Sequence, residues 1–314
     1  MTSAQNLVCS NSSVTNFKQW AKAISDFFAA CGWVKSSDTG QVNWATISSV
    51  PGAGAFVYEV WTPGDGLTAY FLKVEYGNHA SSATTPTIRL SIGATTNGAG
   101  LLTGVIAGPF QTNTSNYTPP GGGVTQYVCR FSGTSGRISA QMWTNSGGAN
   151  AEQFFSVERS VNSSGVYTGT HVTLCTLGFN STQVSSGCGQ QSFVFGVGVP
   201  PPAALPWGVS VSGSGTTYSS ANMSRGFGVR TLQIAASNSS AFNGGISFEL
   251  YAPYVGFWDH QPIGFGITSA VDMVEGLTFQ VTVYGTLRTY MPAKVGLFAN
   301  CDGFGNAALC MLWE

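Results

Sequence analysis

Residues 68–76 read TAYFLKVEY, a run in which large apolar side chains recur at every second position. An extended strand points successive side chains to opposite faces. One face of this run is wholly apolar and consists of Tyr70, Leu72, Val74 and Tyr76. The other face carries Phe71, Lys73 and Glu75. The alternation predicts a β-strand with one face in a hydrophobic core.

The same period-two pattern recurs along the chain and is clear in PTIRLSI (86–92) and RISAQMW (137–143). More such runs are QFFSVER (153–159), HVTLCTL (171–177), SFVFGVG (192–198), RTLQIAA (230–236), GISFELY (245–251), LTFQVTVYG (277–285) and AALCMLW (307–313). Clusters of Gly, Asn, Ser, Thr and Pro separate them. Many short strands divided by turn signals predict a mainly β chain, an antiparallel, jelly-roll-like β-sandwich with one short N-terminal helix.

The convincing helical pattern covers residues 16–31, NFKQWAKAISDFFAAC, with Thr15 as the expected N-cap and Gly32 as the expected end. Its apolar face includes Phe17, Trp20, Ile24 and Phe28. Two interpretations of that face are open. It packs on the chain's own sheet, or it docks the protein on a neighbouring subunit. Because the helix is terminal in a β chain, we expect it to serve attachment as well as packing.

The sequence VGVPPPAALPWG (197–208) is the clearest break in the strand pattern, because consecutive prolines do not fit a central strand. We therefore expect an N-terminal arm and attachment helix over residues 1–33 and a β-sandwich domain over residues 34–199. A second β region follows over residues 200–314 and is either separate from the first or continuous with it.

Charged residues make up 8% of the 314 positions, against about 25% in ordinary soluble domains, and the net charge is −1. This composition argues against nucleic acid as a partner, because phosphate binding needs clustered Lys and Arg. No apolar run reaches the roughly 18 residues of a membrane span, and the first residues lack a signal-peptide pattern. We expect a protein made in a cytosol, without membrane insertion. Closed oligomers hide apolar edges, so we expect a homo-oligomer, specifically a homotrimer.

The sequence KSSDTGQVNW (35–44) contains Asp38-Thr39-Gly40, the tripeptide that carries the catalytic carboxylate of aspartic proteases. That chemistry needs two facing aspartates and an apolar strand before each. Here the preceding residues are polar and no second copy occurs, so Asp38 is predicted to be a structural turn residue.

Other chemistry-bearing residues are sparse. The pair Asp259–His260 lacks an accompanying nucleophile signature, and two strand carboxylates, Glu75 and Glu158, are the remaining candidates for glycosidase chemistry. No catalytic, cofactor-binding or metal-binding residue is predicted. Phe257 and Trp258 are candidates for stacking on a sugar ring, with burial as the favoured alternative. The seven cysteines form no C-x-x-C motif. Whether the pairs Cys175–Cys188 and Cys301–Cys310 form disulfides is left undecided by the sequence.

Two segments together resemble a group of tailed-bacteriophage virion proteins. The first, residues 16–77, has an F-x-x-W helix, then D-T-G-Q-V-N-W, Y-E-V-W and F-L-K-V-E-Y-G. The second is FFSVERSVNSSG (154–165), and the chain end ALCMLWE (308–314) is similar to the ends of those proteins. The resemblance covers about a third of the chain and carries no catalytic residue with it.

The resemblance implies a structural component of a virion, assembled in the host cytoplasm. We expect a tail fibre or tail-associated protein whose partners are copies of itself, other tail proteins and a host-surface glycan. The alternatives are a capsid decoration protein and a carbohydrate-binding or carbohydrate-active β-sandwich protein.

Overall fold

The computed structural model describes residues 1–80, 85–112, 126–144, 152–162, 164–180, 183–184, 189–194, 233–234, 250–251, 260–261, 263–269, 273–297 and 307–314. These residues form one helix and three antiparallel sheets, so the expected mainly β fold with a short N-terminal helix is confirmed. Strong alternation in the sequence is the reason this expectation holds.

The N-terminal sheet consists of five strands that pair in chain order. They are β2 (Val34–Lys35), β3 (Phe56–Thr62), β4 (Phe71–Asn78), β5 (Pro86–Thr96) and β6 (Leu102–Gln111). The register Val57↔Tyr76↔Ile88 places side chains of one parity side by side on the inner face. The apolar face expected for residues 70–76 is that inner face, and its four side chains are fully buried.

The central sheet has eight strands. They are β1 (Thr2–Val8), β7 (Gln126–Thr134), β8 (Arg137–Thr144), β9 (Glu152–Asn162), β10 (Tyr167–Asn180), β11 (Gln183–Val184), β12 (Gly189–Val194) and β15 (His260–Gln261). The first six lie in that order, while β12 pairs with β10 and β15 pairs with β9.

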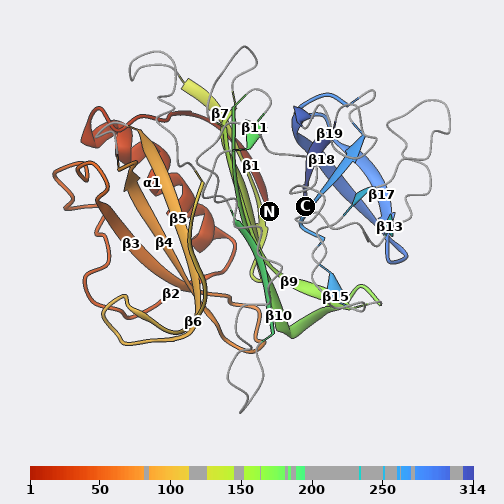
Figure 1. Cartoon of the computed structure of the whole chain (residues 1–314), viewed down its shortest axis with the longest axis horizontal. Coiled ribbons are helices and arrows are strands. Elements are labelled where there is room, and N and C mark those ends of the chain that lie inside the picture. The colour runs from red at the N-terminus through yellow and green to blue at the C-terminus, as the bar shows by residue number, and fades with distance from the viewer. Residues whose placement is uncertain are drawn as a thin grey trace.

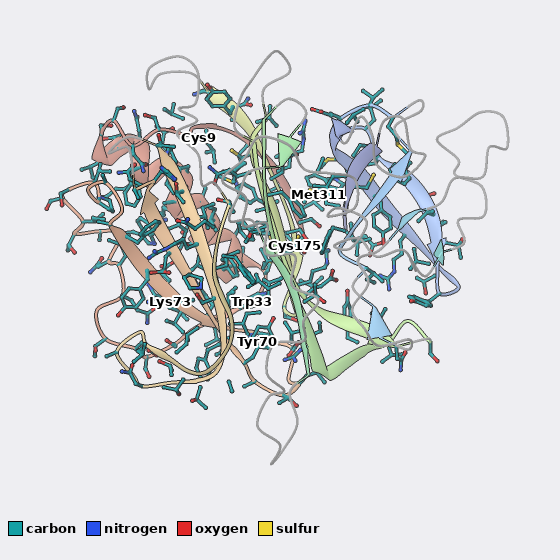
Figure 2. The ribbon with its side chains drawn as sticks, viewed as in Figure 1. Cys9, Trp33, Tyr70, Lys73, Cys175 and Met311 are labelled. Carbon is teal, nitrogen blue, oxygen red and sulfur yellow. The ribbon has the colours of Figure 1, made fainter. Side chains whose placement is uncertain are left out.

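The C-terminal sheet has six strands. In spatial order they are β13 (Gln233–Ile234), β14 (Leu250–Tyr251), β16 (Phe265–Ser269), β19 (Ala307–Leu312), β18 (Thr286–Leu297) and β17 (Phe279–Val283). Figure 1 shows the three sheets as layers, with the central sheet between the other two. In Figure 2 Lys73 marks the N-terminal layer, Cys175 the central layer and Met311 the C-terminal layer.

Helix α1 spans Val14–Ala30 and has well-defined ends. Its N-cap is Ser13, whose Oγ accepts a hydrogen bond from the backbone N of Asn16 at 3.1 Å, so the expectation of Thr15 was wrong by two residues. At the other end Gly32 has φ +84°, as a helix-terminating glycine requires. The N–H groups of Gly32 and Trp33 return to the carbonyls of Ala29 and Phe28, which forms a Schellman motif.

The apolar face of α1 packs inside the chain. The Phe28 ring stacks on Trp61 of the N-terminal sheet with 5.5 Å between ring centres, and the ring centre of Phe27 lies 5.3 Å from that of Phe131 in the central sheet. The proposed attachment residues are almost inaccessible to solvent, with exposed fractions of 0% for Phe17, 0% for Trp20, 1% for Ile24 and 0% for Phe28. A face buried between two sheets cannot also dock on another subunit, so the attachment role of these four side chains is corrected to core packing.

Residues 1–33 are therefore not a separate arm. Strand β1, which the alternation did not predict, pairs with β7 over the whole register from Thr2↔Ser132 to Val8↔Gln126. The helix that follows belongs to the same hydrophobic cluster as both sheets. A second cluster fills the C-terminal sheet and reaches Val161 of β9. The proline-rich break at 197–208 lies outside the described residues.

Candidate functional site

Asp38, the aspartate of the D-T-G tripeptide, ties a turn to the β5–β6 hairpin. Its Oδ1 accepts a hydrogen bond from Ser36 Oγ at 2.7 Å, and its Oδ2 accepts from the backbone N of Gly100 at 2.7 Å and from Thr96 Oγ1. Burial acts to raise the pKa of Asp38, but these hydrogen bonds outweigh it and hold the pKa below its ordinary value. The ionised carboxylate thus connects the 36–40 turn to the β5–β6 hairpin. No second aspartate is among its hydrogen-bond partners.

Tyr58 completes this connection. Its hydroxyl donates to the carbonyls of Thr39, at 2.7 Å, and Ala99, at 3.2 Å. A Cβ on Gly100 would lie 2.3 Å from the Tyr58 ring, so only glycine allows this approach. The D-T-G turn and the GAG sequence of residues 98–100 are packed against one tyrosine.

Glu59 is a charged residue on the core face of the N-terminal sheet. Its side chain is fully buried, and four donors converge on the carboxylate. They are Lys35 Nζ at 2.8 Å, Ser25 Oγ at 2.9 Å, Trp44 Nε1 at 2.9 Å and Tyr76 Oη at 3.0 Å. Burial and the nearby Glu59 carboxylate raise the pKa of Tyr76, so its phenol stays a donor. Glu59 therefore joins the helix, β2, the 43–47 turn and β4.

Glu158 connects the central sheet to the C-terminal sheet. It is fully buried, and its carboxylate accepts hydrogen bonds from the backbone N–H groups of Ile263, at 3.2 Å, and Gly264, at 2.8 Å. Burial raises its pKa to about 7, although the Arg137 guanidinium and the two backbone donors favour the charged form. A Cβ on Gly264 would lie 2.8 Å from both carboxylate oxygens.

Arg137 faces the C-terminal sheet from β8, directly opposite Glu158 in the register. Its Nη1 donates to the carbonyl of Leu312 at 3.1 Å, and its Nη2 donates to Ser132 Oγ at 3.2 Å. Gln141, on the same face, donates to the carbonyl of Ala293. The central sheet thus presents an apolar face to the N-terminal sheet. Its face toward the C-terminal sheet mixes these polar side chains with apolar ones such as Phe154, whose ring centre lies 5.7 Å from that of Phe265.

Arg159 holds the 62–70 loop. Its guanidinium forms a two-point ion pair with Asp65, with Nη2 3.1 Å from Oδ1 and a second contact from Nε to Oδ2. It also donates to the carbonyls of Thr68, at 2.7 Å, and Gly169, at 3.0 Å. The guanidinium carbon lies 5.2 Å from the centre of the Tyr70 ring. All of these contacts are on the side of β9 away from the Glu158 carboxylate.

The two carboxylates considered for glycosidase chemistry do not come together. Glu75 projects from the outer face of the N-terminal sheet, where Arg89 Nη2 pairs with it at 2.8 Å. Glu158 faces the C-terminal sheet, so the hydrophobic core lies between the two acids.

Several residues that the sequence suggested for a site or a disulfide lie outside the part of the chain that the structure describes. They are Phe257, Trp258, Asp259, Cys188 and Cys301. Within the part of the chain that the structure describes, no group of three or more His, Cys, Asp or Glu could hold a metal ion. No helix among those residues is long and apolar enough to cross a membrane.

The buried charges at Glu59, Glu158 and Arg159 were not identified from the sequence. One signal was present for Glu59, because period two in FVYEVWT (56–62) puts it on the same face as Val57 and Trp61. The backbone donors to Glu158, and Asp65 and Thr68 as partners of Arg159, are 91 to 106 positions away along the chain, and no local pattern indicates them.

Comparison with known proteins gives no match: no family model, no curated protein and no solved structure is similar to the chain.

Proposed function

We propose that the chain is a structural component of a bacteriophage virion, a tail fibre or tail-associated protein that assembles as a homotrimer. The observation that supports the proposal is that the charged residues of the shared motifs join separate segments of the fold. Asp38 of D-T-G-Q-V-N-W, Glu59 of Y-E-V-W and the Glu158–Arg159 pair of F-S-V-E-R-S all hold one part of the fold to another. Motif residues used for joining segments suit a building block.

The outer face of the N-terminal sheet argues against sugar stacking there. The Arg89 guanidinium lies 3.6 Å from the centre of the Phe56 ring, and Lys73 Nζ lies 4.5 Å from the centre of the Tyr58 ring. Each ring has a cation on one face, where a sugar would otherwise stack. A host-surface glycan is therefore a partner to be tested through Phe257 and Trp258, which lie outside the described residues.

An antibody raised against the purified chain tests the virion role. Immunoelectron microscopy of phage particles should place the label on the tail. Label over the whole head, with a copy number that follows the capsid lattice, would instead establish the capsid decoration alternative. Absence of the chain from purified particles would reject both, and hydrolysis or binding of a glycan by the purified chain would favour the carbohydrate alternative.

Two adjacent hairpin tips offer a place to test the oligomer. The β9–β10 tip contacts the β17–β18 tip, because a Cβ on Gly165 would lie 3.2 Å from Tyr284 Cβ. Each tip exposes an aliphatic side chain, Val166 at 59% and Leu287 at 57%. We expect a contact between copies to cover these two side chains, because burial of apolar surface is the dominant favourable term in most protein–protein association.

Light scattering on the wild type should give a trimer of 32.8 kDa chains, and the double variant V166D/L287D should shift it toward monomer. The matched control is L101D, which places the same charge at another exposed leucine, on the β5–β6 hairpin. A wild type that scatters as a 32.8 kDa particle at micromolar concentration would overturn the oligomer proposal.

A further inference from the structure

Two buried thiols from distant parts of the chain lie in contact. Cys9 follows β1 and Cys129 belongs to β7, and their Sγ atoms are 3.5 Å apart. The residues are 120 positions apart, and their exposed fractions are 1% and 0%. Each thiol also lies near the carbonyl of the residue two positions before it, Leu7 at 3.6 Å and Tyr127 at 3.8 Å. The sequence alone pointed to other cysteine pairs.

We propose that Cys9 and Cys129 form a disulfide when the folded protein meets an oxidising medium, which locks β1 onto the central sheet. A sulfur–sulfur bond is about 2.05 Å long, so the two Sγ atoms must approach by about 1.5 Å. Rotation about the side-chain bonds of two neighbouring cysteines changes Sγ positions by distances of this size. The strands themselves are already joined by the β1–β7 register.

Access for an oxidant follows from the position of β1. It is the first strand in the order of the central sheet and pairs with β7 along one side. Local opening that separates β1 from β7 would carry Cys9, the residue after β1, out of the cluster that also holds Cys129, and sub-global openings of this kind occur in native proteins. Figure 2 shows Cys9 near one end of the layers.

The chemistry is a two-electron exchange with a small disulfide such as oxidised glutathione. The Cys9 thiol loses its proton, and the thiolate attacks one glutathione sulfur, which forms a mixed disulfide and releases one glutathione thiolate. The Cys129 thiolate then attacks the Cys9 sulfur, forms the protein disulfide and releases the second glutathione. The protein is oxidised, the glutathione disulfide is reduced, and the two protons end on two glutathione thiols.

The consequence is a covalent loop that closes residues 9 to 129. Such a loop encloses helix α1 and the whole N-terminal sheet. Cross-linking over a long loop restricts the unfolded chain, so the oxidised protein should resist denaturant better than the reduced protein. The lock therefore acts on the half of the molecule that contains the larger hydrophobic cluster.

The first test uses the wild-type chain. It is incubated with oxidised glutathione at about pH 8.5, where thiolates are abundant, then quenched with N-ethylmaleimide and digested without reductant. Mass spectrometry should find the Cys9 peptide joined to the Cys129 peptide, lighter than their sum by a pair of hydrogen atoms. Full alkylation of both residues, or a cross-link from either one to another cysteine, would overturn the proposal.

Variants give the second test. C9S and C129S should each lose the cross-link and the oxidant-dependent shift of the urea midpoint to higher concentration. C31S is the matched control, because Cys31 is also a buried thiol of the same cluster and should leave both effects unchanged. A midpoint that rises equally in C9S would assign the stabilisation to another pair. If C9S does not fold, peptide mapping of the wild type still decides.

Discussion

Glu158 and Arg159 are consecutive residues of β9 and are both fully buried, yet they hold segments on opposite sides of the strand. Glu158 accepts the backbone N–H of Gly264 before the C-terminal sheet, whereas Arg159 pairs with Asp65 in the loop that precedes β4. Successive side chains of a strand point in opposite directions, so two neighbours of opposite charge bind different partners instead of each other. The F-S-V-E-R-S sequence of β9 thus binds segments of the N-terminal and C-terminal layers at once.

Stability should rise as the pH falls from about 8 to 5.5. The pKa of Glu158 is about 7 in the folded protein, against an ordinary value of 4.5, so folding takes up a proton in this window. The stabilising contribution is complete below the unfolded pKa and is lost as the pH rises through about 7, a difference of about 2 kcal/mol between pH 5.5 and 8. Urea unfolding over a pH series measures it.

The control for this pH dependence is E158Q, which keeps the shape but cannot titrate. All other titratable groups are the same in both proteins, so the difference between the two slopes isolates Glu158. Parallel slopes for wild type and E158Q would show that Glu158 is already ionised in the folded state across the window.

Replacing Arg159 by Met should destabilise the protein strongly. The change leaves Asp65 without its guanidinium partner and removes the donors to Thr68 and Gly169, which predicts a loss of about 3–5 kcal/mol in the free energy of unfolding. R159K should be intermediate because lysine keeps the charge but not the planar fork. The control K22M breaks the exposed Lys22–Asp26 pair and should cost less than about 0.5 kcal/mol.

E59Q should lower the free energy of unfolding by about 1.5–3 kcal/mol, because four donors lose a charged acceptor. Trp44 is one of the four, so its fluorescence should change in the folded state. E75Q is the comparison, since that carboxylate lies on the outer face of the sheet and pairs with Arg89. Equal effects of the two substitutions would argue that the four donors around Glu59 add no energetic weight beyond that of the Glu75–Arg89 pair.

Deletion of residues 1–33 should prevent folding. It removes β1 and the helix whose side chains fill the space between the N-terminal and central sheets. Each large apolar side chain contributes roughly 1.5–3 kcal/mol when buried, more in total than a typical domain's net stability. Aggregation or loss of a cooperative melt is the expected result. A soluble, cooperatively folding deletion variant that fails to enter virions would restore the attachment role.

The sequence predicts what is local in this fold. The alternation in 68–76 identifies β4 with its buried face, and the apolar spacing in 16–31 identifies α1 to within two residues. It does not show that α1 lies between two sheets, because an apolar helical face looks the same whether its partner is the same chain or another. For Glu59 the alternation in 56–62 shows the face but not the reason an acid can be buried there, because donors such as Tyr76 and Ser25 come from other segments of the chain.

The two unlike faces of the central sheet have a calorimetric consequence. The interface with the N-terminal sheet buries hydrocarbon, whose exposure to water raises the heat capacity, whereas the interface with the C-terminal sheet buries Arg137, Gln141 and Glu158, whose exposure lowers it. Hydrophobic contacts weaken on cooling, and the interface with the C-terminal sheet depends on them less, because its polar groups stand beside apolar contacts such as Phe154–Phe265. Near freezing, the interface between the central sheet and the layer that contains α1 should therefore weaken before the interface with the C-terminal sheet.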